Sequence, residues 1–594
     1  MNAQRPVGFG VFLFALMLSL AGRAQAQVME QIPADAVAVL KFNNPDAIGA
    51  KVTALGQKLG VANFVPLLAD PIGALKQHLN LKDGIDTKGE VAVAMFMPGE
   101  GETDPRVLVF VPVSDYAAFL KNLTNLKTEG ELTTFNMPAD ADPIYAVNWG
   151  SYAVITPWKT LVAQKPVAGI KVAGAAAAQF QSNDVVVFVN VKAIAAKLLP
   201  QLLANKEQVM KQAEIGVPPN LLPASKATMA QILNFVESAL KQGQAATIGL
   251  SLSEKGINFS AMAEFDPAAS LGQTIASIKS SADATLLAGL PSRKYLVYGG
   301  AQLDPAVSAK VFDDAVGPVQ KALEGVDEAA SVVKIMTAVK SILEGTNKIT
   351  VGWAAPAADA KGPPAGQQVT LIGGDSKKVQ AGVRELYQGA IDLMKLVPQG
   401  QGMTIQAEIK PDAKTVDGAN LDQITMQIKF DQNTPMGAQA AQVASSVFGP
   451  EGAISLLGPV SDQTFVSLTG DDEFLTGVVT SAKKAEDTLG QMANVKAVSE
   501  QLPKSKVAVM YIAVDNIVMA GLKYAEQMGM AMPLKLPPDM QPIGFSLSTE
   551  GSALRADMHV SADLMGQLIS TGFQVMQMMQ GGAPRPPAAP APGQ

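Results

Sequence analysis

A group of residues near the C-terminus has the types that a serine hydrolase uses. His559 lies two positions from Asp557 and four from Arg555 on one expected strand, and Ser546 and Ser548 precede them. Serine, histidine and aspartate act as nucleophile, base and orienting carboxylate when their side chains are within hydrogen-bond reach. A hydrolytic triad is therefore the first chemistry to test.

The expected strand register argues against that triad. It places Ser546 opposite Arg555 and His559 beside Pro542, while Asp557 points to the same side as His559. Ser548 is then several residue pairs from His559, about 20 Å at the rise of a β-strand. We assign no catalytic residue, and we expect the protein not to be an enzyme.

Other chemical motifs are weak. Ser331–Lys334 and Ser481–Lys484 have S-x-x-K spacing, but the companion S-D-N and K-T-G motifs are absent. Asp471–Glu473 precedes a helical run and is interpreted as an N-terminal charge cap. With two histidines, His78 and His559, and no cysteine, we expect no metal site and no cofactor.

The methionines suggest an apolar binding surface. Eleven of the 26 methionines fall in the last 94 residues. Flexible thioether side chains can fill a core or line an adaptable groove, and spaced thioethers can also bind Cu(I). We favour the core or groove over copper, and the groove candidates are Met528, Met530, Met532, Met576 and Met579.

A repeated phrase indicates how these residues are positioned. IGLSLSEKG at Ile248–Gly256 and IGFSLSTEG at Ile543–Gly551 share six of nine residues. Alternating apolar and small polar residues on both sides of a Gly-ending turn predict a β-hairpin in each copy. We expect a three-residue loop with a left-handed glycine and a bulge. The expected outer, more polar face carries Ser251, Ser253, Ser546 and Ser548.

Four related units follow from extending the repeat. Each reads strand, helical segment, hairpin, helix, which predicts an α+β fold of four β-α-β-β-α units with mainly antiparallel sheets covered by helices. An internal duplication would explain why long-loop and tight hairpins alternate along the chain. The expected segments are a signal peptide (1–26), unit 1 (27–180, with extra strands), unit 2 (181–282), unit 3 (283–500, with extra strands), the Met-rich unit 4 (501–580) and a Pro/Ala-rich tail (581–594).

The N-terminus has the features of an export signal. Arg5 precedes an apolar stretch that ends near Ala21, and Ala24-Gln25-Ala26 follows, so we expect cleavage after Ala26 and a periplasmic or envelope location. Retention of this segment as an anchor is the alternative. No later segment is apolar enough to span a membrane, and a net charge of −7 gives no reason to expect nucleic acid.

The unit pattern resembles a class of exported bacterial proteins of unknown function. The resemblance is carried by IPADAVAVLKFNN (Ile32–Asn44) and RVLVFVPVSDYAAFL (Arg106–Leu120). It implies export and modular construction, and it implies no activity and no site residues.

These observations favour a non-enzymatic envelope binding or scaffold protein whose partner is an envelope protein or an apolar ligand. A carrier of an apolar ligand such as lipid, held in a Met-rich cleft, is the alternative, and a hydrolase comes third. A continuous apolar patch on an outer sheet face would favour assembly with a partner. A large pocket lined by Met and Leu would favour the carrier.

Overall fold

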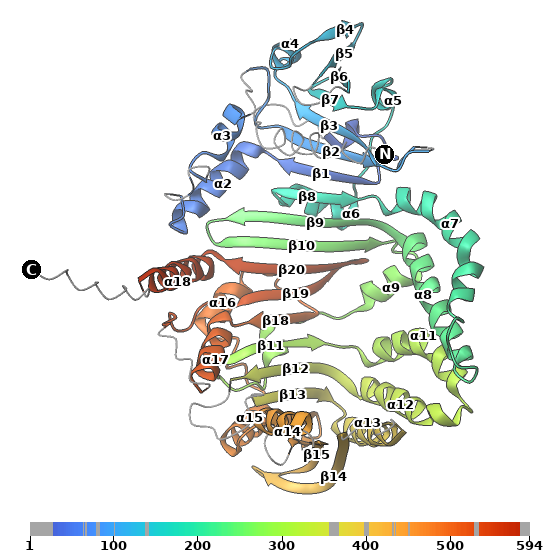
Figure 1. The fold of residues 1–594 in the computed structure, drawn as a ribbon, viewed down its shortest axis with the longest axis vertical. Helices are drawn as coiled ribbons and strands as arrows, with labels where there is room; N and C mark the ends of the chain where they lie inside the picture. The colour runs from blue at the N-terminus through green and yellow to red at the C-terminus, as the bar shows by residue number, and fades with distance from the viewer. Residues whose placement is uncertain are drawn as a thin grey trace, which may run out of the picture.

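The computed structural model describes residues 28–62, 65, 68–78, 83–99, 101–136, 142–355, 367–396, 403–430, 433, 435–448, 452–527 and 534–581. The predicted signal peptide and Pro/Ala-rich tail lie outside these residues. The chain forms an α+β fold around one antiparallel sheet of 20 strands (Figure 1). Within the described residues, no helix combines the length and hydropathy that a membrane crossing requires.

The first half of the chain contributes ten strands and their helices. In chain order these elements are η1 (Val28–Gln31), β1 (Ala38–Asn43), α2 (Pro45–Lys58), α3 (Pro71–His78), β2 (Glu90–Phe96), β3 (Arg106–Pro112), α4 (Tyr116–Leu120), β4 (Lys127–Glu129), β5 (Leu132–Phe135), β6 (Ile144–Trp149), β7 (Tyr152–Thr156), α5 (Lys159–Val162), α6 (Gly174–Ser182), β8 (Val185–Val189), α7 (Val191–Gln212), α8 (Leu222–Gln242), β9 (Gly243–Ser253), β10 (Gly256–Phe265) and α9 (Ser270–Ser277).

The second half contributes the other ten. They are α10 (Asp283–Leu287), β11 (Tyr295–Gln302), α11 (Pro305–Leu323), η3 (Asp327–Ala329), α12 (Ala330–Gly345), β12 (Thr346–Ala354), β13 (Gln367–Gly374), α13 (Ser376–Leu396), β14 (Met403–Val416), β15 (Ala419–Phe430), α14 (Pro435–Phe448), β16 (Ala453–Ser461), β17 (Thr464–Thr469), α15 (Asp472–Lys484), α16 (Ala493–Ser499), β18 (Ala508–Ile512), α17 (Val514–Gln527), β19 (Ile543–Glu550), β20 (Ala553–Ser561) and α18 (Ala562–Gly581).

The two halves have the same strand order. From the outer edge inward, the first half runs β4-β5-β6-β7-β3-β2-β1-β8-β9-β10, and the second runs β14-β15-β16-β17-β13-β12-β11-β18-β19-β20. The halves join where β10 pairs antiparallel with β20 at the centre of the sheet (Figure 1). Shared order is what a duplication would produce, and the duplication and its unit boundaries stay predictions.

Side-chain caps begin several helices. Asp115 accepts the Ala118 N–H at the start of α4. Asn190 caps α7 through the Ala193 N–H and also donates to the carbonyls of Ala34 and Ala36. Because the Asn190 amide contacts both helix and loop, it fixes the direction in which α7 leaves β8.

Short helices cover one face of the central sheet. The Gln179 side chain, in α6, lies 2.9 Å from Ser260 Oγ. Asn183, the residue that follows α6, accepts a hydrogen bond from Ser251 Oγ at 3.0 Å. A methyl group added to Gly544 would lie 2.5 Å from the side chain of Val498 in α16, so that helix packs directly on β19. We call this side of the sheet the closed face.

The opposite face is covered only toward the two ends of the sheet. In the first half, Val52 of α2 packs in one cluster with Leu40, Val185 and Leu252. In the second half, helix α13 and Ile372 of β13 share another cluster. Among the residues that the structure describes, the central strands between these clusters have no comparable buried core on this side.

Both hairpins of the repeated phrase turn in two residues. Ser253 pairs with Gly256, and Glu550 pairs with Ala553. The expected three-residue loop with a bulge is therefore wrong. Across a two-residue turn, residues separated by an odd number of positions lie on the same face of the hairpin. The apolar positions of the two strands therefore share a face without an extra residue at the turn. Gly551 has the expected left-handed φ of 61°, whereas Gly256 has a φ of 145°.

Candidate functional site

Seven central strands carry an apolar surface on the side opposite the closed face. Strands β9, β10, β20, β19, β18, β11 and β12 are each paired on both sides, so their backbone groups are used within the sheet. We call the following side chains the apolar sheet face: Ala246, Ile248, Leu250, Ile257, Phe259, Ala261, Ala263, Leu554, Ala556, Met558, Val560, Ile543, Phe545, Leu547, Thr549, Ala508, Met510, Ile512, Val297, Gly299, Ala301, Ile349, Val351 and Trp353. Thr549 is the one polar side chain among them, and none is charged.

Large side chains on this surface are open to solvent. The exposed fraction is 58% for Ile248, 40% for Phe259, 40% for Met510, 40% for Val351 and 44% for Trp353. Antiparallel sheets that face water on one side normally alternate apolar and polar residues, with the polar side outward. Here the outward side is apolar over seven strands. An exposed apolar surface of this extent marks an interaction site.

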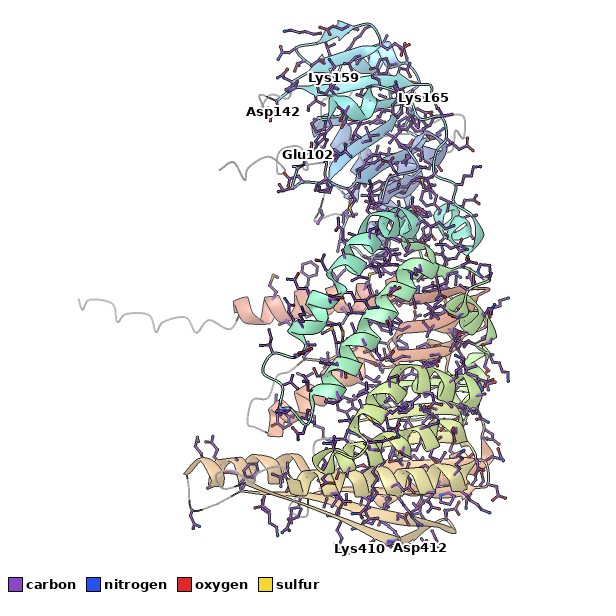
Figure 2. All side chains as sticks on the ribbon, turned by 90° about the vertical axis from the view of Figure 1, so that its right-hand side faces the viewer. Glu102, Asp142, Lys159, Lys165, Lys410 and Asp412 are labelled. Atoms are coloured by element: carbon purple, nitrogen blue, oxygen red, sulfur yellow. The ribbon has the colours of Figure 1, made fainter. Side chains whose placement is uncertain are left out.

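Helices stand at both ends of these strands. Figure 1 shows α7, α8, α11 and α12 at one end and α17 and α18 at the other. In Figure 2, α18 and the α7–α8 pair extend to the same side of the sheet. The exposed apolar side chains of α17 and α18 are Ile517 (41%), Met519 (49%), Tyr524 (50%), Phe573 (40%) and Met576 (55%). The helices at this end of the strands therefore also carry exposed apolar side chains.

The methionine candidates fall in three places. Met528, Met530 and Met532 lie outside the described residues, between α17 and β19. Met576 lies on α18 and is 55% exposed. Met579 belongs to the same helix, although its side chain lies outside the described set. The methionine content therefore directed attention to unit 4 and away from the sheet residues. Their alternation is visible in the sequence, but their apolar side was expected to be covered.

The serines of the repeated phrase lie on the closed face, so their expected outward position is wrong. Ser546 and Ser548 are 5% and 2% exposed. Neither hydroxyl has a hydrogen-bond partner among the described residues. Small side chains are required here because α6 and α16 cross this side of the central strands. The pattern of alternation was correct, but the choice of the buried side was inverted.

The register at β19 and β20 also differs from the expected one. Gly544 pairs with His559, Ser546 with Asp557, and Ser548 with Arg555. Each expected pair is displaced by two residues, because the turn consists of Gly551 and Ser552 alone and β19 stays paired as far as Glu550. Ser546 therefore lies closer to His559 than expected, two residue pairs along the strand, or about 7 Å.

His559, Asp557 and Ser546 do not form a triad in this register. His559 Nδ1 lies 2.7 Å from Asn258 Oδ1 on β10, while Asp557 accepts two bonds from Arg555. Burial, with a smaller effect of the positive charge on Lys255, lowers the pKa of His559 to about 4. Burial raises the pKa of Asp557, against the opposing effect of Arg555. The two groups belong to separate interactions.

A buried polar cluster joins the closed face to α10 and α16. Asp283 accepts hydrogen bonds from Lys506, Ser499 and Tyr511, and Lys506 is 2% exposed. Lys506 Nζ lies 3.4 Å from Ser499 Oγ. Activation of a serine by lysine requires the serine proton to pass to the amine, but here the Ser499 hydroxyl donates to Asp283, which also accepts from Lys506. The cluster fixes helices to the sheet, and sequence spacing gave no signal for it.

The acidic run near residue 471 is a helix cap, as expected. Asp471 accepts the Phe474 N–H at 2.8 Å at the start of α15, and its other oxygen accepts from Gln367. Among the described residues, no group of three or more His, Asp or Glu side chains is arranged to hold a metal ion.

Comparisons with known proteins give no family. No family model matches the chain, and no curated protein matches it. Crystal form III of TP0453 is similar at 11% identity and a TM-score of 0.20, covering 49% of this chain and 99% of that one. Form IV gives 11% identity and a TM-score of 0.19, with 49% and 97% covered. We base no conclusion on a likeness of this size.

Proposed function

We propose that this protein is a non-enzymatic binding protein of the cell envelope that holds the acyl chains of a lipid against the apolar sheet face. The observation that carries the proposal is a seven-strand sheet surface without a charged side chain, exposed where a polar surface is normal. The predicted export signal belongs to the same proposal, because it would place the protein beside the lipids that it binds.

A continuous apolar patch on a sheet is also the feature expected for assembly with a partner, but the chemistry of this surface favours acyl chains over a protein partner. Protein interfaces contain about one hydrogen bond per 100–200 Å². The apolar sheet face offers one side-chain hydroxyl, from Thr549, and its backbone groups are already paired on both sides. A ligand that requires no directed polar contact suits such a surface. Helices at both ends of the strands also restrict access for a flat partner (Figure 1).

The exposed area is large enough to contribute to binding. Complete burial of a large apolar side chain contributes about 1.5–3 kcal/mol. Ile248, Phe259, Met510, Val351 and Trp353 are 40–58% exposed. Covering them completely would therefore contribute about 1 kcal/mol each, or about 5 kcal/mol together. The half-exposed residues between them add to this value.

Native mass spectrometry of protein purified from its own envelope fraction tests the proposal. We expect a mass increment that corresponds to phospholipid and is lost on extraction with organic solvent. The variant Phe259→Lys/Met510→Lys places charge on two exposed positions and should abolish the increment without unfolding the protein. Leu126→Lys, at a residue that is also 40% exposed but precedes the outer strand β4, is the matched control.

Two results would contradict the proposal. A bare monomer recovered from the envelope would remove its basis. A co-purified protein in place of lipid, lost in the same double variant, would assign the apolar sheet face to protein assembly.

A further inference from the structure

The helical pair α7–α8 has an unusual amount of exposed apolar surface. Helix α7 runs for 22 residues and buries none of them. The exposed fraction is 38% for Leu198 and 44% for Leu203 on α7, 78% for Ile215 in the connecting loop, and 52% for Ile232 and 67% for Phe235 on α8. The packing of α8 against α11 leaves these side chains uncovered.

The same segment is basic in an acidic protein. Residues 191–242 contain six lysines and three glutamates, a net charge of +3, whereas the whole chain carries −7, which leaves −10 on the rest. Two of the glutamates pair with lysines of the segment. Lys192, Lys197 and Lys211 are exposed and contact no carboxylate among the described residues.

We propose that α7–α8 docks the protein on a membrane surface rich in anionic phospholipid. Helices that lie in the membrane interface combine lysines on a polar side with Leu and Phe on an apolar side. The three unpaired ammonium groups complement lipid phosphates, and Phe235, Ile232 and Leu203 enter the region between headgroups and acyl chains. This surface is distinct from the apolar sheet face. The apolar sheet face would hold the lipid, and α7–α8 would place the protein at the membrane where that lipid is loaded and released.

An acidic protein is the competing partner for a basic helix. Lysines alone would attract it, whereas docking on a bilayer also requires the exposed apolar side chains to insert. Phe235 separates the two, because it carries no charge and is already 67% exposed.

Co-sedimentation of the mature chain with vesicles tests the inference. Vesicles of phosphatidylcholine with 30% phosphatidylglycerol should bind the protein at low salt, and pure phosphatidylcholine vesicles should bind it far less. Each surface lysine changes membrane partitioning about fivefold. The variant Lys192→Gln/Lys197→Gln/Lys211→Gln should therefore bind about 100-fold more weakly.

Two further variants complete the design. Phe235→Ser should also weaken vesicle binding while the circular dichroism spectrum stays unchanged. Lys121→Gln/Lys127→Gln/Lys171→Gln removes three exposed lysines elsewhere and should bind as the wild type does. If both lysine triple variants lost vesicle binding equally, net charge alone would explain the binding, and the inference would be overturned. Normal binding by Phe235→Ser would assign the segment to an acidic protein.

The test is separable from that of the proposed function. The α7 triple variant should retain the lipid increment in native mass spectrometry, since the apolar sheet face is untouched. If the wild-type protein carried no lipid mass increment but still bound vesicles, the proposed function alone would be overturned.

Discussion

His559 should titrate far below the usual range of histidine, and this can be measured directly. The ring is buried on the closed face, 1% exposed, and its Nδ1 lies 2.7 Å from Asn258 Oδ1. Burial and the positive charge of Lys255 lower its pKa from 6.5 to about 4. The neutral ring is therefore the native form throughout the physiological range.

The sign and size of the effect on stability follow from this shift. Between pH 6.5 and 4 the unfolded chain binds a proton at His559 and the folded chain does not. Stability is therefore complete above pH 6.5 and is lost as the pH falls toward 4. The lowering of the His559 pKa from 6.5 to about 4 corresponds to about 3 kcal/mol, of which about 2 kcal/mol is lost between pH 7.5 and pH 5.

Histidine-selective isotope labelling makes the assay simple, because the chain contains only two histidines, His78 and His559. In a His78→Gln background, the NMR signal of the remaining ring should not titrate above pH 5. In urea unfolding, His559→Gln should lose less stability than the wild type between pH 7.5 and pH 5, by about 2 kcal/mol.

A titration midpoint of 6 or higher for His559 would refute the reasoning. It would mean that water or a carboxylate reaches the ring, and that the closed face is not dry at this position. An unchanged pH dependence of stability in His559→Gln would lead to the same conclusion.

The remaining predictions concern the cluster at Asp283, the turn glycines and the apolar sheet face. Lys506→Met should lower the free energy of unfolding by about 3 kcal/mol, because it leaves the Asp283 carboxylate buried without its cation; a urea midpoint within error of the wild type would contradict this. Gly256→Ala should lower the melting temperature more than Gly551→Ala, since a methyl group at Gly256 would lie 2.2 Å from the Val560 carbonyl oxygen while Gly551 has open space around it; equal shifts in scanning calorimetry would count against this packing. Ile248→Ser should change the free energy of unfolding by less than about 1 kcal/mol, because the side chain is 58% exposed, and should weaken lipid retention in native mass spectrometry; a loss of stability with unchanged retention would mean that Ile248 belongs to the core.

Local patterns in the sequence predicted the elements well but could not decide which side of the sheet is covered. Alternation in both copies of the repeated phrase identified β9 and β19 as strands, and Asp471 was expected as a helix cap. Period two divides a strand into two faces without saying which one another element covers. That choice depends on α6 and α16, which are distant in sequence from the strands that they cover.

The candidate site was harder to predict for the same reason. Methionine content directed attention to the end of the chain, whereas the apolar sheet face combines residues from seven strands, among them Ile248 and Trp353. Each strand alone has an ordinary apolar side. Only the strand order makes the surface continuous, and strand order depends on long-range pairing such as that between β10 and β20.

The pairing of β10 with β20 has a consequence for any shorter form of this chain. Ala261 and Ala556 face each other across it, 295 positions apart, the same separation as the two copies of the repeated phrase. A chain that ended after α9 would leave the ten-residue strand β10 as an unpaired edge. An edge of that length recruits another strand, and a second copy offers an identical one in antiparallel orientation. Covalent linkage of the two halves thus turns a concentration-dependent association into an intramolecular one.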